Sequence, residues 1–370
     1  MPTVSSVVIP WLSAALLAQT PIAAPAPVVK PVFVLASVTQ DKDKDKDKQK
    51  DKDKDKSDKD QDRDRIRERI RERDRGPEQT ERLANSFTVG AASSLFLTNI
   101  AGDITIKGGT GNEIRVEALK HGKGGNDSDA RMQLQNIQVM MNKVGDRVEI
   151  KALHAGRNNR GWVDFTIYVP TTTSVEVQSV SGDLALYNVK GELHGQTVSG
   201  DVTGSGLGKV AALKTMSGDV RINGVESSGP LSLSAMSGDV VIENLHAPSV
   251  DAESVSGDVR LKSCSCDRVR LQSVSGDLEY VGQITRSGRY EIKTHSGGIR
   301  LAVPPASGFE IDANSFTGDI TFDPPITAIL SQGRRGPMPG RVAHGVIGNG
   351  GAFVELSSFS GDIVVNRGGK

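Results

Sequence analysis

The chain has 370 residues, of which 45 are acidic and 45 basic, so its formal net charge of zero excludes a general electrostatic attraction to nucleic acid or anionic lipid. Two cysteines exclude a fold that depends on many disulfides, and 41 glycines with only 4% aromatic residues are typical of a narrow β interior. Composition divides the chain into an apolar start, a charged stretch and a β-patterned remainder, and only the remainder is able to bury a core.

Residues 1–26 form an apolar leader. The run 4–18 is followed by small residues such as Ala23 and Ala24, as in the hydrophobic region and cleavage zone of a secretory signal, although no Lys or Arg precedes it. A disordered leader and a misassigned start remain open. The run is shorter than the roughly 20 residues of a membrane span. We therefore expect an exported protein (periplasmic, cell-surface or secreted) without a stable membrane span in the mature chain, or a cytoplasmic protein if the leader is no signal.

Residues 27–85 read as a disordered linker. A Pro-rich part precedes alternating Asp and Lys, and then alternating Arg with acidic residues in which Ile66 and Ile70 lie four apart, as on one face of a short helix. A flexible spacer of about 45 residues would span on the order of 40 Å. Such a spacer could hold a domain away from an envelope, and a solubilising tail without a further task is the alternative.

Residues 86–170 alternate irregularly between apolar and polar residues, with candidate strands at 114–118, 148–153 and 163–169. A solenoid needs a covered end to stay soluble. This segment therefore predicts an N-terminal β cap in front of regular repeats at 171–370.

The repeats carry one phrase: a hydrophobic residue, Ser, Gly, Asp, then Val, Leu or Ile. The glycines of the phrase, which we expect to be structural, are Gly182, Gly200, Gly218, Gly238, Gly257, Gly276, Gly318 and Gly361, with Gly297 in a variant copy. From 182 to 318, Gly297 included, they are 18 to 21 residues apart, about one turn of a solenoid. The last step of 43 residues has room for two turns with one degenerate phrase.

Apolar columns at fixed distances from each glycine predict the inside of the solenoid. The columns two and four residues after the glycine, the pair seven and five residues before it, and a column seven residues after it are all expected to face inward. By parity the column two residues before it, for example Val180, Met216 and His295, is also expected to face inward, with the Ser and Asp outward. A parity slip between the columns marks a corner, so each turn has two or three short strands.

The aspartates of the phrase form a second column: Asp183, Asp201, Asp219, Asp239, Asp258 and Asp277. Stacked in register, these carboxylates would lie about 4.8 Å apart and repel one another. Three arrangements would relieve the repulsion: hydrogen bonds from backbone N–H groups, ion pairs with Arg221, Arg260 and Arg300, or bound calcium. The first is favoured and calcium is the least favoured, so no metal is expected.

No other motif predicts catalysis or a cofactor. Cys264 falls in an inward column and is interpreted as a buried free thiol, with a disulfide to Cys266 as the lesser alternative. The segment 330–351, rich in glycine and arginine, is interpreted as a slack loop insertion, with a functional protrusion as the alternative. Acids that repeat identically, instead of converging in one cluster, are typical of architecture, so we expect no enzymatic activity and no cofactor.

The repeated phrase over about residues 86–370 resembles the bacterial "putative adhesin" family of unknown function. The resemblance implies a β-solenoid at or beyond the cell envelope without established catalysis. We therefore expect a non-enzymatic, adhesin-like binding or structural module whose partner is an unknown protein or glycan of the envelope, not nucleic acid. The alternatives are an envelope-stress scaffold that acts by protein contact and, less favoured, a glycan-active enzyme.

Overall fold

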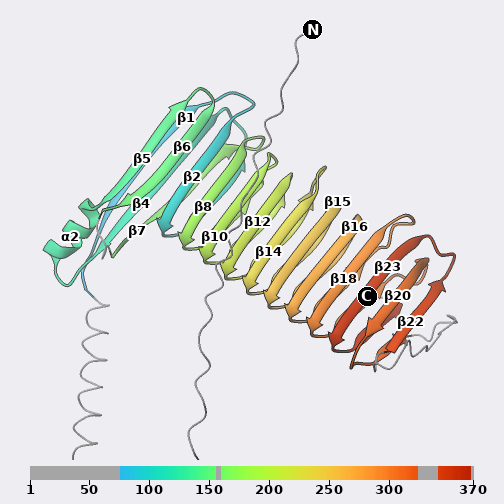
Figure 1. Ribbon diagram of the computed structural model, residues 1–370. Coiled ribbons are helices and arrows are strands. Elements are labelled where there is room, and N and C mark those ends of the chain that lie inside the picture. Colours follow the sequence, from blue (N-terminus) through green and yellow to red (C-terminus); the bar gives the residue numbers. More distant parts are fainter. Residues whose placement is uncertain (1–75, 156–159, 324–340, 368–370) are drawn as a thin grey trace, which may run out of the picture. The chain divides into compact units, whose positions relative to one another are not determined.

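The computed structural model describes residues 76–155, 160–323 and 341–367, all within the second of the chain's two compact units, Arg67–Lys370. The described residues of this unit form a 24-stranded sheet wound into a solenoid, with one short helix, α2 (Asp127–Gln135), near its N-terminal end (Figure 1). The predicted all-β solenoid is thereby confirmed. The leader 1–26 and residues 27–75 of the predicted linker lie outside the described residues.

Each coil of the solenoid has a strand on a first face, a corner at the Ser-Gly-Asp phrase, and a strand on a second face. In stacking order the first-face strands are β6 (Arg147–His154), β2 (Ser94–Ala101), β8 (Ser174–Ser181), β10 (Leu193–Ser199), β12 (Val210–Ser217), β14 (Leu231–Ser237), β15 (Val240–Ser256), β16 (Val259–Ser275), β18 (Arg289–Ser296), β23 (Ala352–Ser360) and β20 (Phe309–Ser315). Neighbours pair in parallel, and Figure 1 shows most of these strands side by side.

The second face repeats this order with shorter strands. Its strands are β7 (Gly161–Pro170), β3 (Ile104–Gly109), β9 (Leu184–Tyr187), β11 (Val202–Leu207), β13 (Val220–Glu226), the first halves of β15 and β16, β17 (Leu278–Gly282), β19 (Ile299–Val303), β24 (Ile363–Arg367) and β21 (Ile320–Asp323). A further corner follows six residues after the glycine, where Asn188, Gly224 and Asn244 have φ of 54°, 70° and 55°. The prediction of two or three short strands per coil agrees with this outline.

The core is a continuous apolar column inside the coils. The columns two, four and seven residues after the glycine are buried, for example Val240, Ile242 and Leu245, as is the pair seven and five residues before it, for example Leu231 and Leu233. The sequence predicted these columns correctly. Most of the filling is Val, Leu and Ile, because two parallel faces leave room for branched aliphatic side chains.

The column two residues before the glycine was predicted to face inward, and this was wrong. Val180, Met216, Met236 and Val274 are 50%, 46%, 51% and 51% exposed. The parity slips at the glycine itself: the residue three before it is buried and the residue two before it points outward. His295, predicted to be inward, is likewise exposed.

The N-terminal cap contains antiparallel strands, which a regular coil does not. β1 (Glu78–Thr88) pairs with β4 (Glu113–Lys123), β4 pairs with β7, and β5 (Ile137–Val144) pairs with β6. Because β1 begins at Glu78, residues 78–85 belong to the β structure and not to the linker. Helix α2, which the sequence analysis did not predict, starts at Asn126, whose side chain accepts a hydrogen bond from the Asp129 N–H (2.8 Å).

At both ends of the stack, chain order and stacking order differ. The coil of β2 and β3 lies between those of β6–β7 and β8–β9, and the coil of β23 and β24 lies between those of β18–β19 and β20–β21. The predicted pair of turns in the last 43-residue step is therefore wrong. β22 (Arg341–Ile347) runs antiparallel to β20 and covers the end of the first face, so 341–347 is a strand and not a loop, while 324–340 lies outside the described residues.

Candidate functional site

One row of apolar side chains on the first face points into solvent instead of the core. We call it the outer apolar row, and it contains, in stacking order, Ile100, Val180, Val198, Met216, Met236, Val255, Val274, His295, Phe359 and Phe316. Eight of these residues, excluding His295 and Phe316, are 39–51% exposed. A single exposed apolar residue needs no explanation, but a contiguous series along ten coils is typical of an interaction surface.

A polar row beneath it explains the outward direction. The residue three before each glycine is usually Ser or Thr. In several coils its hydroxyl donates to the carbonyl of the glycine in the preceding coil, as from Thr215 to Gly200 (3.0 Å), Ser254 to Gly238 (2.9 Å) and Ser273 to Gly257 (3.1 Å). These hydroxyls are buried and hydrogen-bonded. Since the strand alternates, the next residue must point outward.

The repeat glycines form a column of close backbone contacts between coils. A Cβ added at Gly218 would lie 2.2 Å from the Gly200 carbonyl oxygen, and one added at Gly238 would lie 2.0 Å from that of Gly218. Both glycines have positive φ, 144° and 152°. The glycines therefore permit the close stacking of the coils.

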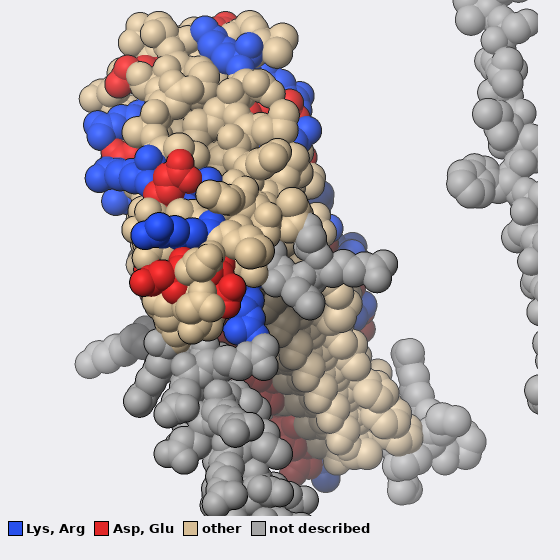
Figure 2. All heavy atoms as spheres, turned by 90° about the vertical axis from the view of Figure 1, so that its left-hand side faces the viewer, with Lys and Arg blue, Asp and Glu red and all other residues tan. Residues whose placement is uncertain are grey.

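A shallow groove of about 770 Å³ runs along the outer apolar row. Its lining combines members of the row, such as Met216, Met236 and Phe359, with polar neighbours such as Lys214 and Glu253. Figure 2 shows the unit from its N-terminal end, where charged side chains gather. The coils behind this end carry a broad band without Lys, Arg, Asp or Glu.

The C-terminal end of the row is aromatic. The ring of Phe359 stacks between His295 (4.8 Å between centroids) and Phe316 (4.7 Å), with interplanar angles of 8° and 7°. The row thus changes from branched and thioether side chains to rigid rings along its length. Met side chains adapt to irregular surfaces, whereas stacked rings hold one shape.

The predicted aspartate column borders this face at the corner. Each carboxylate accepts a hydrogen bond from the backbone N–H of the next coil, as Asp201 does from Asp219 (2.9 Å) and Asp219 from Asp239 (2.7 Å). The same contact joins Asp183, Asp239, Asp258 and Asp277 to their following coils. The favoured arrangement, backbone N–H donation to the carboxylates, is thus present, although it links successive coils and is not a local turn.

Two arginines lie across the column. Arg221 bridges Asp201 (3.4 Å) and Asp219, and Arg260 bridges Asp239 (3.2 Å) and Asp258. Arg300 makes no such bridge among the described residues, since Gly298 replaces the aspartate of its coil. In the described ranges no group of three or more His, Cys, Asp or Glu side chains is placed to hold a metal ion.

Charged side chains farther from the corner share the first face. Lys293 contacts Glu355 (2.7 Å) and Glu291 (2.9 Å). Hydrogen bonding to Glu355 raises the pKa of Lys293, and hydrogen bonding from Lys293 holds the pKa of Glu291 below its ordinary value of 4.5. Burial raises the pKa of Asp251 on β15, which β16 separates from β18. The rim of the face is therefore a mixed-charge surface.

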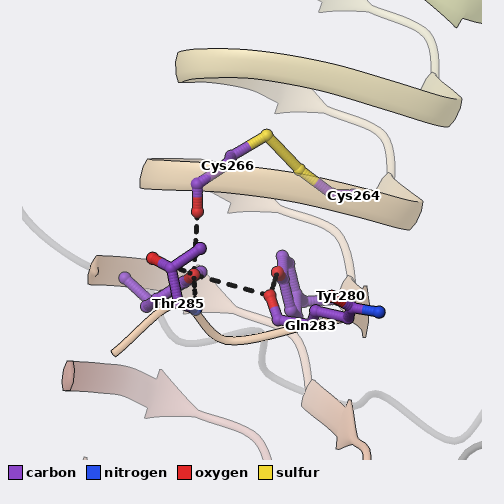
Figure 3. The surroundings of a disulfide bond; sticks show 6 residues. Cys264, Cys266, Tyr280, Gln283 and Thr285 are labelled. Carbon is purple, nitrogen blue, oxygen red and sulfur yellow. Dashed lines mark hydrogen bonds between the residues drawn. A yellow bond between two sulfur atoms is a disulfide. The ribbon is translucent and has the colours of Figure 1, made fainter. Parts of the chain in front are cut away.

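Cys264 and Cys266 form a disulfide inside the coil, contrary to the favoured interpretation of a free thiol (Figure 3). Both residues are at most 2% exposed. The Tyr290 hydroxyl donates to the Cys266 carbonyl oxygen (2.8 Å), and the Tyr280 hydroxyl donates to that of Gln283 (2.7 Å). Alternate residues of one strand point to the same side, which is how the two sulfur atoms meet.

Comparison with known proteins gives a family and distant structural relatives. The sequence profile of the Toastrack DUF4097 family matches residues 92–366. None of the curated proteins matches the chain. No helix among the described residues is long and apolar enough to cross a membrane.

Three crystal structures are similar. A "putative adhesin" from Bacteroides fragilis NCTC 9343 is 14% identical with a TM-score of 0.39, covering 77% of this chain and 97% of that chain. A "putative lipid binding protein" from Parabacteroides distasonis ATCC 8503 is 9% identical with a TM-score of 0.37, covering 78% and 97%. A "putative cell adhesion protein" from Clostridium sporogenes ATCC 15579 is 9% identical with a TM-score of 0.22, covering 78% and 100%.

Proposed function

The chain belongs to the Toastrack DUF4097 family, and on this premise we propose that it is an exported, adhesin-like binding module of the cell envelope, not an enzyme. The observation that carries the proposal is the outer apolar row, which leaves apolar side chains of eight coils exposed to solvent on one face. Leaving such a surface exposed is unfavourable unless a partner covers it.

The aspartate column supports a binding role over a catalytic one. Catalytic acids converge on one point with different environments, whereas these carboxylates each accept the same backbone hydrogen bond. Arg221 and Arg260 neutralise four of them in the same repeating manner. The aspartate column is therefore suited to stabilising the corner of each coil beside the binding face.

The Cys264–Cys266 disulfide supports export. Disulfides persist in oxidising compartments and are rare in the cytosol, where thiols are kept reduced. Cell fractionation tests this part of the proposal: the protein should be found outside the cytoplasm, without residues 1–26. Cytosolic protein that retains the leader would contradict export and favour a scaffold that acts by contact inside the cell.

Binding is tested by co-sedimentation of the purified full chain with envelope fractions from its own cells. The double variant Met216→Glu/Met236→Glu places two charges in the middle of the row and should abolish binding. Val144→Glu is the matched control, because Val144 is 78% exposed on β5, away from the row, and this variant should bind as the unchanged chain does. Equal binding by all three proteins would contradict the proposal.

A further inference from the structure

We propose that the partner of the outer apolar row is a second copy of this chain, and that two copies pair through their first faces with the stacks running in opposite directions. The inference rests on the proposed binding role of the same face and names its partner. The two-fold axis would lie between the two faces, parallel to β14 and level with Met236. Each coil before β14 in one copy would then face a coil after β14 in the other.

The size of the face suits a stable dimer. The nine coils from β2 to β23 are symmetric about β14. At about 4.8 Å per coil they give a length of roughly 38 Å, while strands of about seven residues give a width of roughly 20 Å. The resulting area of roughly 800 Å² per copy is that of a standard protein–protein interface. The first face is built from parallel strands, with a register shift at Leu193 and His194 as the irregularity between β10 and β12, so it offers this area as one surface.

The register along the face is self-complementary in charge. Lys214, Ser234 and Glu253 are direct neighbours on β12, β14 and β15, with Lys214 paired to Ser234 and Ser234 paired to Glu253. An axis level with β14 therefore places Lys214 of each copy opposite Glu253 of the other. Both side chains are exposed, and neither forms an ion pair with another described residue.

The apolar row is compatible with the same axis. Met236 would face Met236, Met216 would face Val255, and Val198 would face Val274. In an interface between identical copies related by a two-fold axis, every contact away from the axis occurs twice, once from each copy. This arrangement makes those contacts between apolar residues throughout the centre. Nothing in a glycan or lipid ligand would call for Lys and Glu at equal distances on either side of one strand.

The rim contains one unfavourable pair between β8 and β18, and a second between the outermost strands β6 and β20, where Glu149 would lie opposite Asp312 but already contacts Lys151 (2.8 Å). Glu176 would lie opposite Glu291, but Lys293 already contacts Glu291 at 2.9 Å. Charges at a rim affect the rate of association more than the affinity. The centre of the face therefore decides the pairing.

Sedimentation equilibrium of the full chain tests the dimer, and the expected mass is twice that of the chain. Met236→Glu should weaken association about 100-fold or more, because two like charges would meet at the axis. Lys214→Glu and Glu253→Lys should each weaken it about 10-fold, and the double variant Lys214→Glu/Glu253→Lys should restore it. Val144→Glu should dimerise like the unchanged chain, and circular dichroism verifies that each variant is folded.

The inference would be overturned if the unchanged chain were monomeric. It would also be overturned if each single charge exchange weakened the dimer and the double exchange failed to restore it. Envelope fractions from cells that lack this protein distinguish a failure of the dimer from a failure of the proposed function. If the partner is a second copy, the purified chain should not bind to these fractions. Persistent binding by a monomeric chain would overturn the dimer and leave the binding role intact, whereas a dimer that binds no envelope fraction would contradict the binding role alone.

Discussion

At the scale of single residues, the repeat glycines carry the strictest steric demand. Gly238→Ala introduces a Cβ 2.0 Å from the Gly218 carbonyl oxygen at a φ of 152°, so the two coils would have to separate. We expect a loss of at least about 2 kcal/mol in the free energy of unfolding, measured by urea denaturation. Gly109→Ala is the control, because nothing lies within 4 Å of its added Cβ, and it should change stability by less than about 0.5 kcal/mol. Equal effects would contradict the steric argument.

The aspartate column leads to a second prediction at the scale of residues, which concerns the stability of the fold. Asp219 accepts the Asp239 N–H at 2.7 Å and also pairs with Arg221. Asp219→Ala should lower stability by about 1–2 kcal/mol, since it leaves the Asp239 N–H without this acceptor. Asp219→Asn keeps an amide oxygen in the same place and should lose less than half as much.

Calcium provides the contrast for this column. Because the carboxylates already hold backbone N–H groups, added calcium should not raise the melting temperature of the unchanged chain. A calcium-dependent rise that Asp219→Asn removes would show that the column binds the cation instead.

At the scale of strands, the charged rows of the first face predict a pH dependence. Lys293 holds the pKa of Glu291 below 4.5, so this contribution to stability is complete above that value and is lost as the pH falls from 4.5 through the lowered pKa of the folded state. The pKa of Lys293 is raised in turn, so its contribution is lost only in alkali. For a partly exposed group the effect is about 0.5 kcal/mol.

The measurement is the melting temperature between pH 6 and pH 3. Glu291→Gln should be less stable than the unchanged chain at pH 6, and the difference should shrink as the pH falls toward 3 and the carboxylate takes up its proton. If the difference in melting temperature between the two proteins stayed constant across this range, Glu291 would contribute to stability through packing and not through its charge.

Strands also show how far the sequence could predict the fold. The spacing of the glycines and the columns after them predict the coil correctly, because burial of alternate residues leaves a direct trace in the sequence. The outer apolar row was misplaced because Thr215 and its equivalents are polar yet buried, held by glycine carbonyls, while Met216 and its equivalents are apolar yet exposed. A hydrophobic pattern alone assigns such a pair to the wrong sides.

Other elements leave weaker traces. The cap helix α2 has a recognisable start at Asn126, followed by Asp127 and Asp129, but its apolar side is short. The exchanged stacking order at both ends has no local signature, since strand order depends on which coils meet in space. The Cys264–Cys266 bond depends on the direction of two side chains on one strand, and the spacing alone left the free thiol and the disulfide open.

At the scale of the whole molecule, a stack in which each coil contacts only its neighbours predicts graded stability. Terminal coils have one neighbour and inner coils have two, so opening should begin at the ends. Amide hydrogens of β13, β14 and β15 should exchange most slowly, and those of β21 and β22 much faster. Uniform exchange along the described coils would indicate instead that the solenoid opens as one unit.

The position of the coil of β23 and β24 also bears on how the protein is made. Residues 309–323 leave the ribosome before residues 352–367, yet the later segment lies between them and the coil of β18 and β19. The growing chain can therefore add coils in order only as far as residue 303. The end of the stack has to wait until synthesis is nearly complete, and a chain that is cut short would leave β18 and β19 as open edges for other strands to join.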